Sequence, residues 1–421
     1  MTTNTITFED ITKELPVDYE QQAYDLNVFQ RARKIKTPKQ LLQVVMCYCG
    51  VDTVLRETAG IITMLTTYIS DTAVQNRLKS CLPWLKALLE QMWPGASYVL
   101  PQLRFVVIDG TTVQAPGAKG TDYRLHIMMD LLKLQILNVK ITDKYTGESL
   151  NHFEFEKGDV VVADRGYNQP LRIIELHKKE IFVLLRLNPW ATPLYKVENK
   201  DILPIDLYEI LKESKNEICM PVLIKKDENN APAWLHARRL PPKKAEKARR
   251  MCRKNSKTTP TQKTLLFCEW TLILTTVPLE IMSTNDALGI YKLRWQVEIL
   301  IKRLKSVLDI DKLRAKRGGV LADVWLYGKL LYAMIVERRA MKKFGEDWAW
   351  ISNQRDATWW RFWRLVNHEL LSAIIASDHW IESNWAACKK AMRERPRKRK
   401  LHSAKDFIFD ISARYKNLVI S

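Results

Sequence analysis

Four side chains within residues 291–305 combine the chemistry needed to hold a metal ion against a phosphate. The segment reads YKLRWQVEILIKRLK, and it carries a phenol, two cations and a carboxylate at Tyr291, Arg294, Lys305 and Glu298. An α-helix of about 3.6 residues per turn places all four on one face. A solvated helix surface held by ion pairs between Glu and Lys has the same pattern. This segment alone leaves both interpretations open.

Two aspartates upstream each follow a short run of apolar, mostly β-branched residues. Asp109 lies in RFVVIDG at 104–110, and Asp164 lies in DVVVADRGY at 159–167. Such runs predict buried strands, and strand ends in an α/β sheet are where ligands bind. Either aspartate alone also fits a simple turn former. Together with Glu298, the two form a set of three hard oxygen ligands suited to Mg²⁺ or Mn²⁺.

These motifs resemble those of the DDE transposases of bacterial insertion sequences. One branch of that family carries the signature Tyr-x2-Arg-x3-Glu-x6-Lys, which residues 291–305 match without a gap. The IDGTT block at Asp109 and the ADRGY block at Asp164 are similar to the family's first and second acidic motifs. The resemblance covers residues 100–310 and implies a ribonuclease-H-like catalytic core.

The resemblance also implies how the three acids act. Two Mg²⁺ ions per active site, for which Mn²⁺ substitutes, would activate water and neutralise charge on the phosphate. Asp109 would bridge both ions, Asp164 would hold one and Glu298 the other. Water would release a 3′-OH at the end of the element. That 3′-OH would then attack target DNA without a covalent enzyme intermediate.

Seven side chains are expected from the resemblance to contact DNA. They are Tyr291, Arg294, Lys305, Trp270, Trp295, Arg186 and Arg165. Arg294 and Lys305 would grip phosphates, because a guanidinium offers a fork and an ammonium a point charge. Trp270 stands 21 residues before Tyr291, where the branch places an aromatic that receives a base flipped out of the duplex. The alternatives are a Trp270 packed within a sheet and an Arg165 paired with a core carboxylate.

The charge balance predicts a polyanionic partner. The 421 residues carry 67 Lys and Arg against 47 Asp and Glu, a formal net charge of +20. This excess favours nucleic acid over a membrane and fits poorly with a metal-free glycosidase. Seven scattered cysteines without a Cys-x2-Cys pair are typical of a reducing cytosol, so we expect a cytoplasmic protein, at the nucleoid when bound to DNA. No apolar run reaches the ~18–20 residues of a membrane span, and the N-terminus lacks the apolar core of a signal peptide.

The order of helical and strand-like patterns predicts an α/β protein. A ribonuclease-H-like catalytic core, interrupted by a β-rich insertion, is expected between helical N- and C-terminal domains. The expected boundaries are 1–95 for a helical DNA-binding domain, 96–188 and 281–319 for the two parts of the core, 189–280 for the insertion, and 320–421 for a helical domain that is the candidate dimerisation region.

Local patterns place individual elements. Helices are expected at 39–51, 53–66, 72–81 and 169–179, and strands at 104–109, 123–132, 134–142, 159–164, 181–187, 218–224 and 264–274. The helices at 53–66 and 72–81 fit a helix-turn-helix that reads DNA, and they also fit a plain helical bundle.

Two basic segments and a group of tryptophans complete the expectations. Residues 243–263 carry nine Lys and Arg against one Glu, and we expect a disordered loop that binds phosphates in a salt-dependent way. The run at 393–400 is expected to be a solvated basic loop. Eight of the 14 tryptophans lie beyond residue 320 and are expected in a core or a subunit contact.

Three functions remain open at this point. The leading one is a cut-and-paste transposase that binds its own terminal inverted repeats, pairs them as a homodimer and joins them to target double-stranded DNA. A catalytically inactive repeat-binding protein is the second, and the intact set of acidic residues speaks against it. A ribonuclease-H-like nuclease that cuts without joining is the third, and the signature helix with the long insertion favours transposition over it.

Overall fold

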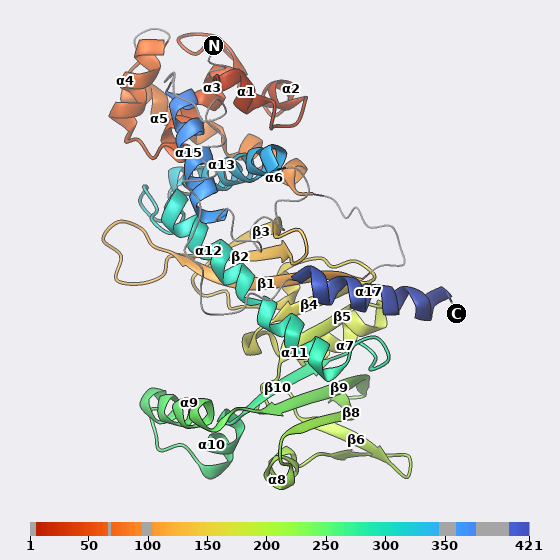
Figure 1. The fold of residues 1–421 in the computed structure, drawn as a ribbon. Helices are drawn as coiled ribbons and strands as arrows, with labels where there is room; N and C mark the ends of the chain where they lie inside the picture. The colour runs from red at the N-terminus through yellow and green to blue at the C-terminus, as the bar shows by residue number, and fades with distance from the viewer. Residues whose placement is uncertain (1–5, 66–68, 95–102, 345–358, 376–403, 421) are drawn as a thin grey trace.

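The sheet at the centre of the molecule contains strands from both the predicted core and the predicted insertion. The computed structural model describes residues 6–65, 69–94, 103–344, 359–375 and 404–420. Ten strands follow the order β3-β2-β1-β4-β5-β10-β9-β8-β6-β7 in one sheet, and helices gather at the end that holds the N-terminus (Figure 1). The mixed α/β class is confirmed.

Five strands form the half of the sheet that carries the acidic motifs. β1 (Arg104–Val113), β2 (Tyr123–Asp130) and β3 (Gln135–Asp143) pair antiparallel in succession. β4 (Asp159–Ala163) pairs parallel with β1, and β5 (Phe182–Arg186) pairs parallel with β4. Successive side chains of β1 and β4 belong to two different buried clusters, one on each face. Burial on both faces explains why these strands are continuous apolar runs in the sequence.

The parallel pairing brings the two aspartates to one edge of the sheet. β1 and β4 run parallel, so their carboxyl ends point the same way, and helix α7 (Pro170–Lys178) forms the crossover from β4 to β5. Val107 pairs with Val162, and Asp109 and Asp164 each lie two residues further along. The strand predicted to end at Asp109 instead continues to Val113, because residues 109–113 keep pairing with β2. The strands and the helix predicted in this half are confirmed to within two residues at the other boundaries.

The insertion extends this sheet and does not form a sheet of its own. β10 (Trp270–Thr275) pairs antiparallel with β5, and β9 (Asn229–Arg239) and β8 (Glu217–Lys226) follow. The hairpin of β6 (Leu194–Glu198) and β7 (Asp201–Pro204) ends the sheet. A single buried cluster on one face includes side chains from β1 through to β8. The two halves therefore share a hydrophobic core.

Most of the basic segment 243–263 is helical, so the prediction of a disordered loop was wrong. α9 (Pro242–Asn255) begins at a proline, buries Ala245 and is followed by α10 (Gln262–Cys268). Arg249 on α9 forms a 2.5 Å ion pair with Glu269. Lys, Arg and Ala are good helix formers, and solvent screens the repulsion between the exposed charges. The strand predicted at 264–274 accordingly begins only at Trp270.

The signature segment is divided between two helices rather than lying on one. α11 (Thr284–Leu293) starts with a capping box between Ser283 and Asp286, and α12 (Trp295–Leu308) follows directly. Arg294 separates them but keeps a right-handed helical backbone, with φ −48° and ψ −31°. The two helices follow one another across one face of the sheet (Figure 1).

Helices from both ends of the chain pack together. The N-terminal helices are α1 (Phe8–Thr12), α2 (Tyr19–Asp25), α3 (Pro38–Val45), α4 (Leu55–Leu65), α5 (Asp71–Ser80) and α6 (Leu82–Met92). They pack around α13 (Val320–Phe344) and α15 (Trp359–Ile374), while α17 (Ala404–Ile420) lies against α11 (Figure 1). The buried ammonium of Lys329 on α13 contacts Asp52, at a distance of 2.5 Å. The helix predicted at 39–51 ends as a π-helical turn, Met46–Gly50, and those predicted at 53–66 and 72–81 are α4 and α5.

Part of the predicted tryptophan group can be located. Trp325 and Trp363 are fully buried, which confirms a core role for both. Trp348, Trp350, Trp380, Trp385 and the basic run at 393–400 lie outside the described residues. Within the described ranges, none of the helices is long and apolar enough to cross a membrane.

Candidate active site

Asp109 and Asp164 lie on neighbouring strands, and only Asp164 directly follows a strand end, because β1 continues to Val113. Asp109 lies within β1, its side chain is 16% exposed, and its Oδ1 accepts a 2.8 Å hydrogen bond from the Gly110 amide. Asp164 caps a short 3₁₀ turn, Arg165–Tyr167, by accepting a 2.6 Å hydrogen bond from the Gly166 amide. These backbone bonds hold both carboxylates at the edge where the sheet meets α12.

Arg294 joins the first aspartate to the glutamate of the signature. One guanidinium nitrogen lies 3.2 Å from Asp109 Oδ2, and the other lies 2.6 Å from Glu298 Oε1. Residues 109 and 298, which are far apart in the sequence, are thereby held together by one cation. In the structure, the Arg294 guanidinium therefore binds carboxylates, whereas the sequence predicts that it contacts a phosphate.

Of the other signature residues, Tyr291 lies beside this ion pair and Lys305 lies further along α12. The Tyr291 ring centroid lies 5.8 Å from the Arg294 guanidinium carbon, and burial raises the pKa of the Tyr291 phenol. Lys305 lies half-buried on α12, seven residues beyond Glu298. Trp295 is 50% exposed, with the Lys302 ammonium 4.4 Å from its ring centroid.

A fourth carboxylate, Glu148, lies in the same cluster and was missed by sequence reasoning. A Cβ atom built on Gly110 would lie 3.1 Å from Glu148 Oε1, and one on Gly166 would lie 2.6 Å from Oε2. Burial raises the pKa of Asp109 to about 6, and the negative charges of Asp164 and Glu148 also raise it. The Gly110 hydrogen bond and the charge of Arg294 act in the opposite direction. Glu148 is the last residue of the Gly-containing turn at 143–148, and no spacing rule links it to the acidic motifs.

The donor set suits a divalent metal ion, although the side chains are not drawn together around one. All four carboxylates offer hard oxygen atoms of the kind that Mg²⁺ and Mn²⁺ prefer. The structure describes no group of three Asp, Glu, His or Cys side chains close enough to hold an ion between them. Instead, Asp109 and Glu298 share the charge of Arg294.

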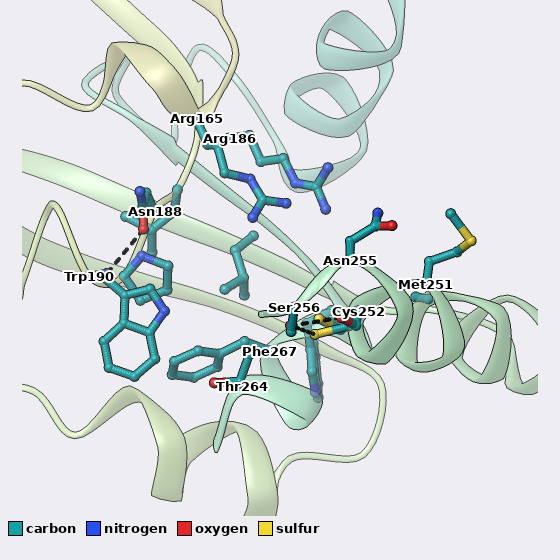
Figure 2. A pocket seen from close by; sticks show the side chains of 16 residues that line it. Arg165, Arg186, Asn188, Trp190, Met251, Cys252, Asn255, Ser256, Thr264 and Phe267 are labelled. Carbon is teal, nitrogen blue, oxygen red and sulfur yellow. Dashed lines mark hydrogen bonds between the residues drawn. The ribbon is translucent and has the colours of Figure 1, made fainter. Parts of the chain in front are cut away.

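A cavity of about 390 Å³ opens beside Asp164 and contains two arginines. Figure 2 shows Arg165 and Arg186 side by side at one end, with Trp190 and Phe267 further along the wall. Burial lowers the pKa of Arg186, and the charge of Arg165 lowers it further. Within the described parts of the chain, neither guanidinium has a carboxylate at salt-bridge distance, so the alternative in which Arg165 pairs with a core carboxylate is not observed.

Trp270 forms part of the wall of this cavity from within the sheet. Its side chain is only 1% exposed, and the Arg239 guanidinium carbon lies 5.9 Å from its ring centroid. Its indole nitrogen has no hydrogen-bond partner among the described residues. The packed arrangement is therefore the one observed, at a position that also borders the cavity.

Comparison with known proteins identifies the class. A family model described as "Transposase DDE domain" matches residues 100–333, and the chain belongs to this family. It is therefore a DNA transposase, an enzyme of DNA cleavage and strand transfer that depends on a divalent metal ion and binds DNA.

Two relatives from Escherichia coli illustrate the similarity. The chain is 29% identical over 334 residues to the putative transposase InsL for insertion sequence element IS186A of strain K12, and 28% identical over 335 residues to the transposase for insertion sequence element IS421. Each match covers 76% of this chain and 90% of the relative. The resemblance deduced from the acidic and signature motifs is thus confirmed.

Proposed function

We propose that this protein moves an insertion sequence by cut-and-paste transposition, with Asp109, Asp164 and Glu298 as its catalytic acids. The observation that carries the proposal is the meeting of the three motifs. Parallel strands β1 and β4 bring Asp109 and Asp164 to one edge, and Arg294 ties Asp109 to Glu298. Similarity to transposases of insertion sequences supports the same conclusion.

A ribonuclease-H-like core is part of this proposal. The order β3-β2-β1-β4-β5, with three antiparallel strands followed by two parallel ones, supports it. The segments 96–188 and 281–319 would form this core, and 189–280 would be its insertion. The helical segments 1–95 and 320–421 would bind DNA and contribute to a homodimer that pairs two terminal repeats in the cytoplasm.

Mg²⁺, at two ions per site, is the proposed metal, with Mn²⁺ as a substitute. When bound, such ions supply an activated water or 3′-OH and neutralise the phosphate. Asp109, Asp164 and Glu298 would hold them. Arg294 would then exchange its carboxylate partners for a phosphate oxygen, because metal charge on the carboxylates weakens their attraction for the guanidinium. This exchange reconciles the observed ion pairs with the predicted phosphate contact.

The arginine cavity is the proposed binding region for the DNA end. Arg165 and Arg186 would take a phosphate, since they lie next to Asp164 and lack a described carboxylate partner. Trp270 would receive a flipped base only after its edge becomes accessible, whereas Trp295 is already exposed. Tyr291 and Lys305 would add contacts along α11 and α12. The basic helix α9 forms part of the same cavity and would bind the backbone nearby.

An in vitro transposition reaction tests the proposal. Purified protein, Mg²⁺ and a labelled duplex carrying the terminal repeat from the flanks of its gene would be followed on denaturing gels, with Glu298→Ala and an EDTA sample alongside. Cleavage at the element end followed by joining to a plasmid, lost in both controls, is the expected result. Cleavage without joining would favour a nuclease, and binding without cleavage would favour an inactive repeat-binding protein.

A further inference from the structure

We infer that Glu148 is a fourth carboxylate of the catalytic centre and acts with Asp164 to hold a divalent ion. The inference rests on the proposed function, because it assigns one more residue to the same metal centre. It goes beyond the three acidic motifs, since Glu148 belongs to none of them.

The position of Glu148 places its carboxylate over both acidic motifs at once. Its two oxygens face Gly110, which follows Asp109, and Gly166, which lies two residues after Asp164. A Cβ atom on Gly166 would be 2.6 Å from Glu148 Oε2 and 3.0 Å from Asp164 Oδ1. Oxygens of both carboxylates therefore approach the same point in space.

The two glycines provide the space that Glu148 occupies. Neither Gly110 nor Gly166 has a positive φ, so their backbone conformations do not require glycine. A side chain at Gly166 would collide with the Glu148 carboxylate, and one at Gly110 would crowd it. The Glu148 carboxylate therefore occupies the space beside both glycines, and a larger residue at either position would have to displace it.

The turn that carries Glu148 is attached to the segment after Asp164. The Gln169 Oε1 accepts hydrogen bonds from the Leu150 amide at 3.0 Å and from the Ser149 hydroxyl at 3.2 Å. The Gln169 Nε2 donates a 3.4 Å hydrogen bond to the Glu148 carbonyl. These contacts hold Glu148 near Asp164 before any ligand binds, which is the arrangement that a precise metal site needs.

The charges in the cluster are unevenly balanced. Asp109 and Glu298 share Arg294, whereas no cation of the described residues forms a salt bridge with Asp164 or Glu148. Asp164 and Glu148 repel one another, and the charges of Arg124 and Arg294 offset this at Glu148 only in part. A divalent ion between the two carboxylates would remove the repulsion. Mg²⁺ is commonly held by one or two carboxylates with water completing the shell, so this pair can suffice without a third protein ligand.

Direct metal binding by the full-length protein tests the inference. Mn²⁺ alone would be titrated without DNA and followed by electron paramagnetic resonance for the wild type, Glu148→Gln, Asp164→Asn and the matched control Glu154→Gln. Glu154 is exposed and lies only six residues further along the chain. We expect Glu148→Gln to weaken Mn²⁺ binding at least about 10-fold, because even loss of a group that only supports a metal ligand has an effect of this size, while the control leaves it unchanged. The Mg²⁺ concentration for half-maximal cleavage should rise in parallel.

The outcomes separate this inference from the proposed function. If Asp164→Asn loses Mn²⁺ binding and Glu148→Gln retains it, Glu148 is not part of the metal centre. If neither substitution changes binding, the metal assignment of the proposed function fails as well. Should Glu148→Gln not fold, Gly110→Ala provides a second test, because its methyl group would crowd the Glu148 carboxylate and the nearest atoms outside the adjoining residues all belong to Glu148. Weakened Mn²⁺ binding in that variant would support the inference, and unchanged binding would overturn it.

Discussion

Two groups of charges on either side of Asp164 differ in how they are neutralised. On one side, Asp109 and Glu298 enclose the guanidinium of Arg294. On the other, Arg165 and Arg186 line a cavity with no carboxylate of the described residues in salt-bridge range. The carboxylates of the first group can exchange the Arg294 guanidinium for metal ions. The two arginines of the second group need an anion from another molecule to neutralise them. A DNA phosphate beside bound metal ions satisfies both requirements.

The largest effect is expected from the carboxylate side. Asp109→Asn, Asp164→Asn and Glu298→Gln should each lower cleavage and strand transfer more than about a thousandfold, because essential catalytic residues act as a unit. Binding of the terminal repeat should be retained, which a mobility-shift assay with each variant would measure. Retained strand transfer in any of the three would refute the assignment of that residue.

The tryptophans beside the two groups should differ in their effect on stability. Trp270→Ala removes a fully buried indole next to the arginine cavity and should lower the free energy of unfolding by about 3–5 kcal/mol. Trp295→Ala removes a half-exposed ring beside Arg294 and should change it by less than about 0.5 kcal/mol. Urea unfolding of both variants would measure the difference. Equal losses would show that Trp270 is less embedded in the sheet than its burial indicates.

The arginine side should contribute to DNA affinity rather than to chemistry. Arg186→Ala should weaken binding of the terminal repeat by about 1.5–3 kcal/mol, the usual value of a hydrogen bond to a charged group. It should also reduce the salt dependence of binding by about one released counterion. Titrations at several salt concentrations would measure both quantities. Arg172→Ala is the control, because Arg172 already forms an ion pair with Glu175, and an equal loss there would remove the case for the cavity.

A smaller, pH-dependent effect should come from one buried histidine in each half of the sheet. Burial lowers the pKa of His126 on β2 and of His236 on β9 to about 4, from about 6.5 in an unfolded chain. Each buried neutral histidine disfavours protonation in the folded state. Its contribution to the free energy of unfolding is therefore fully present above about pH 6.5. It falls by at most about 3 kcal/mol as the pH decreases toward about 4. His236→Gln should therefore flatten the fall in melting temperature between pH 7 and pH 5. An unchanged slope would mean that His236 does not titrate on unfolding.

Local sequence patterns were sufficient to predict most elements in the half of the sheet that carries the acidic motifs. The apolar runs ending at Asp109 and Asp164 predicted β1 and β4, because strands buried on both faces must be apolar throughout. The periodicity of residues 291–305 predicted the helical face of the signature, although α11 and α12 divide at Arg294. The prediction failed for residues 243–263, where the high density of charge suggested disorder. Helix-forming side chains, the buried Ala245 and the Arg249–Glu269 ion pair instead stabilise a helix there.

The sequence by itself determined the family, the three acidic motifs and the type of most elements, since these depend on residue identity and short-range spacing. Only the tertiary structure decided that Arg294 lies on carboxylates, that Glu148 joins Asp164, and that Arg165 and Arg186 share a cavity. The physical reason is that such contacts depend on sheet register and on how α12 and the 143–148 turn pack over the strand ends. Residues dozens to hundreds of positions apart meet through that packing, and no local periodicity encodes it.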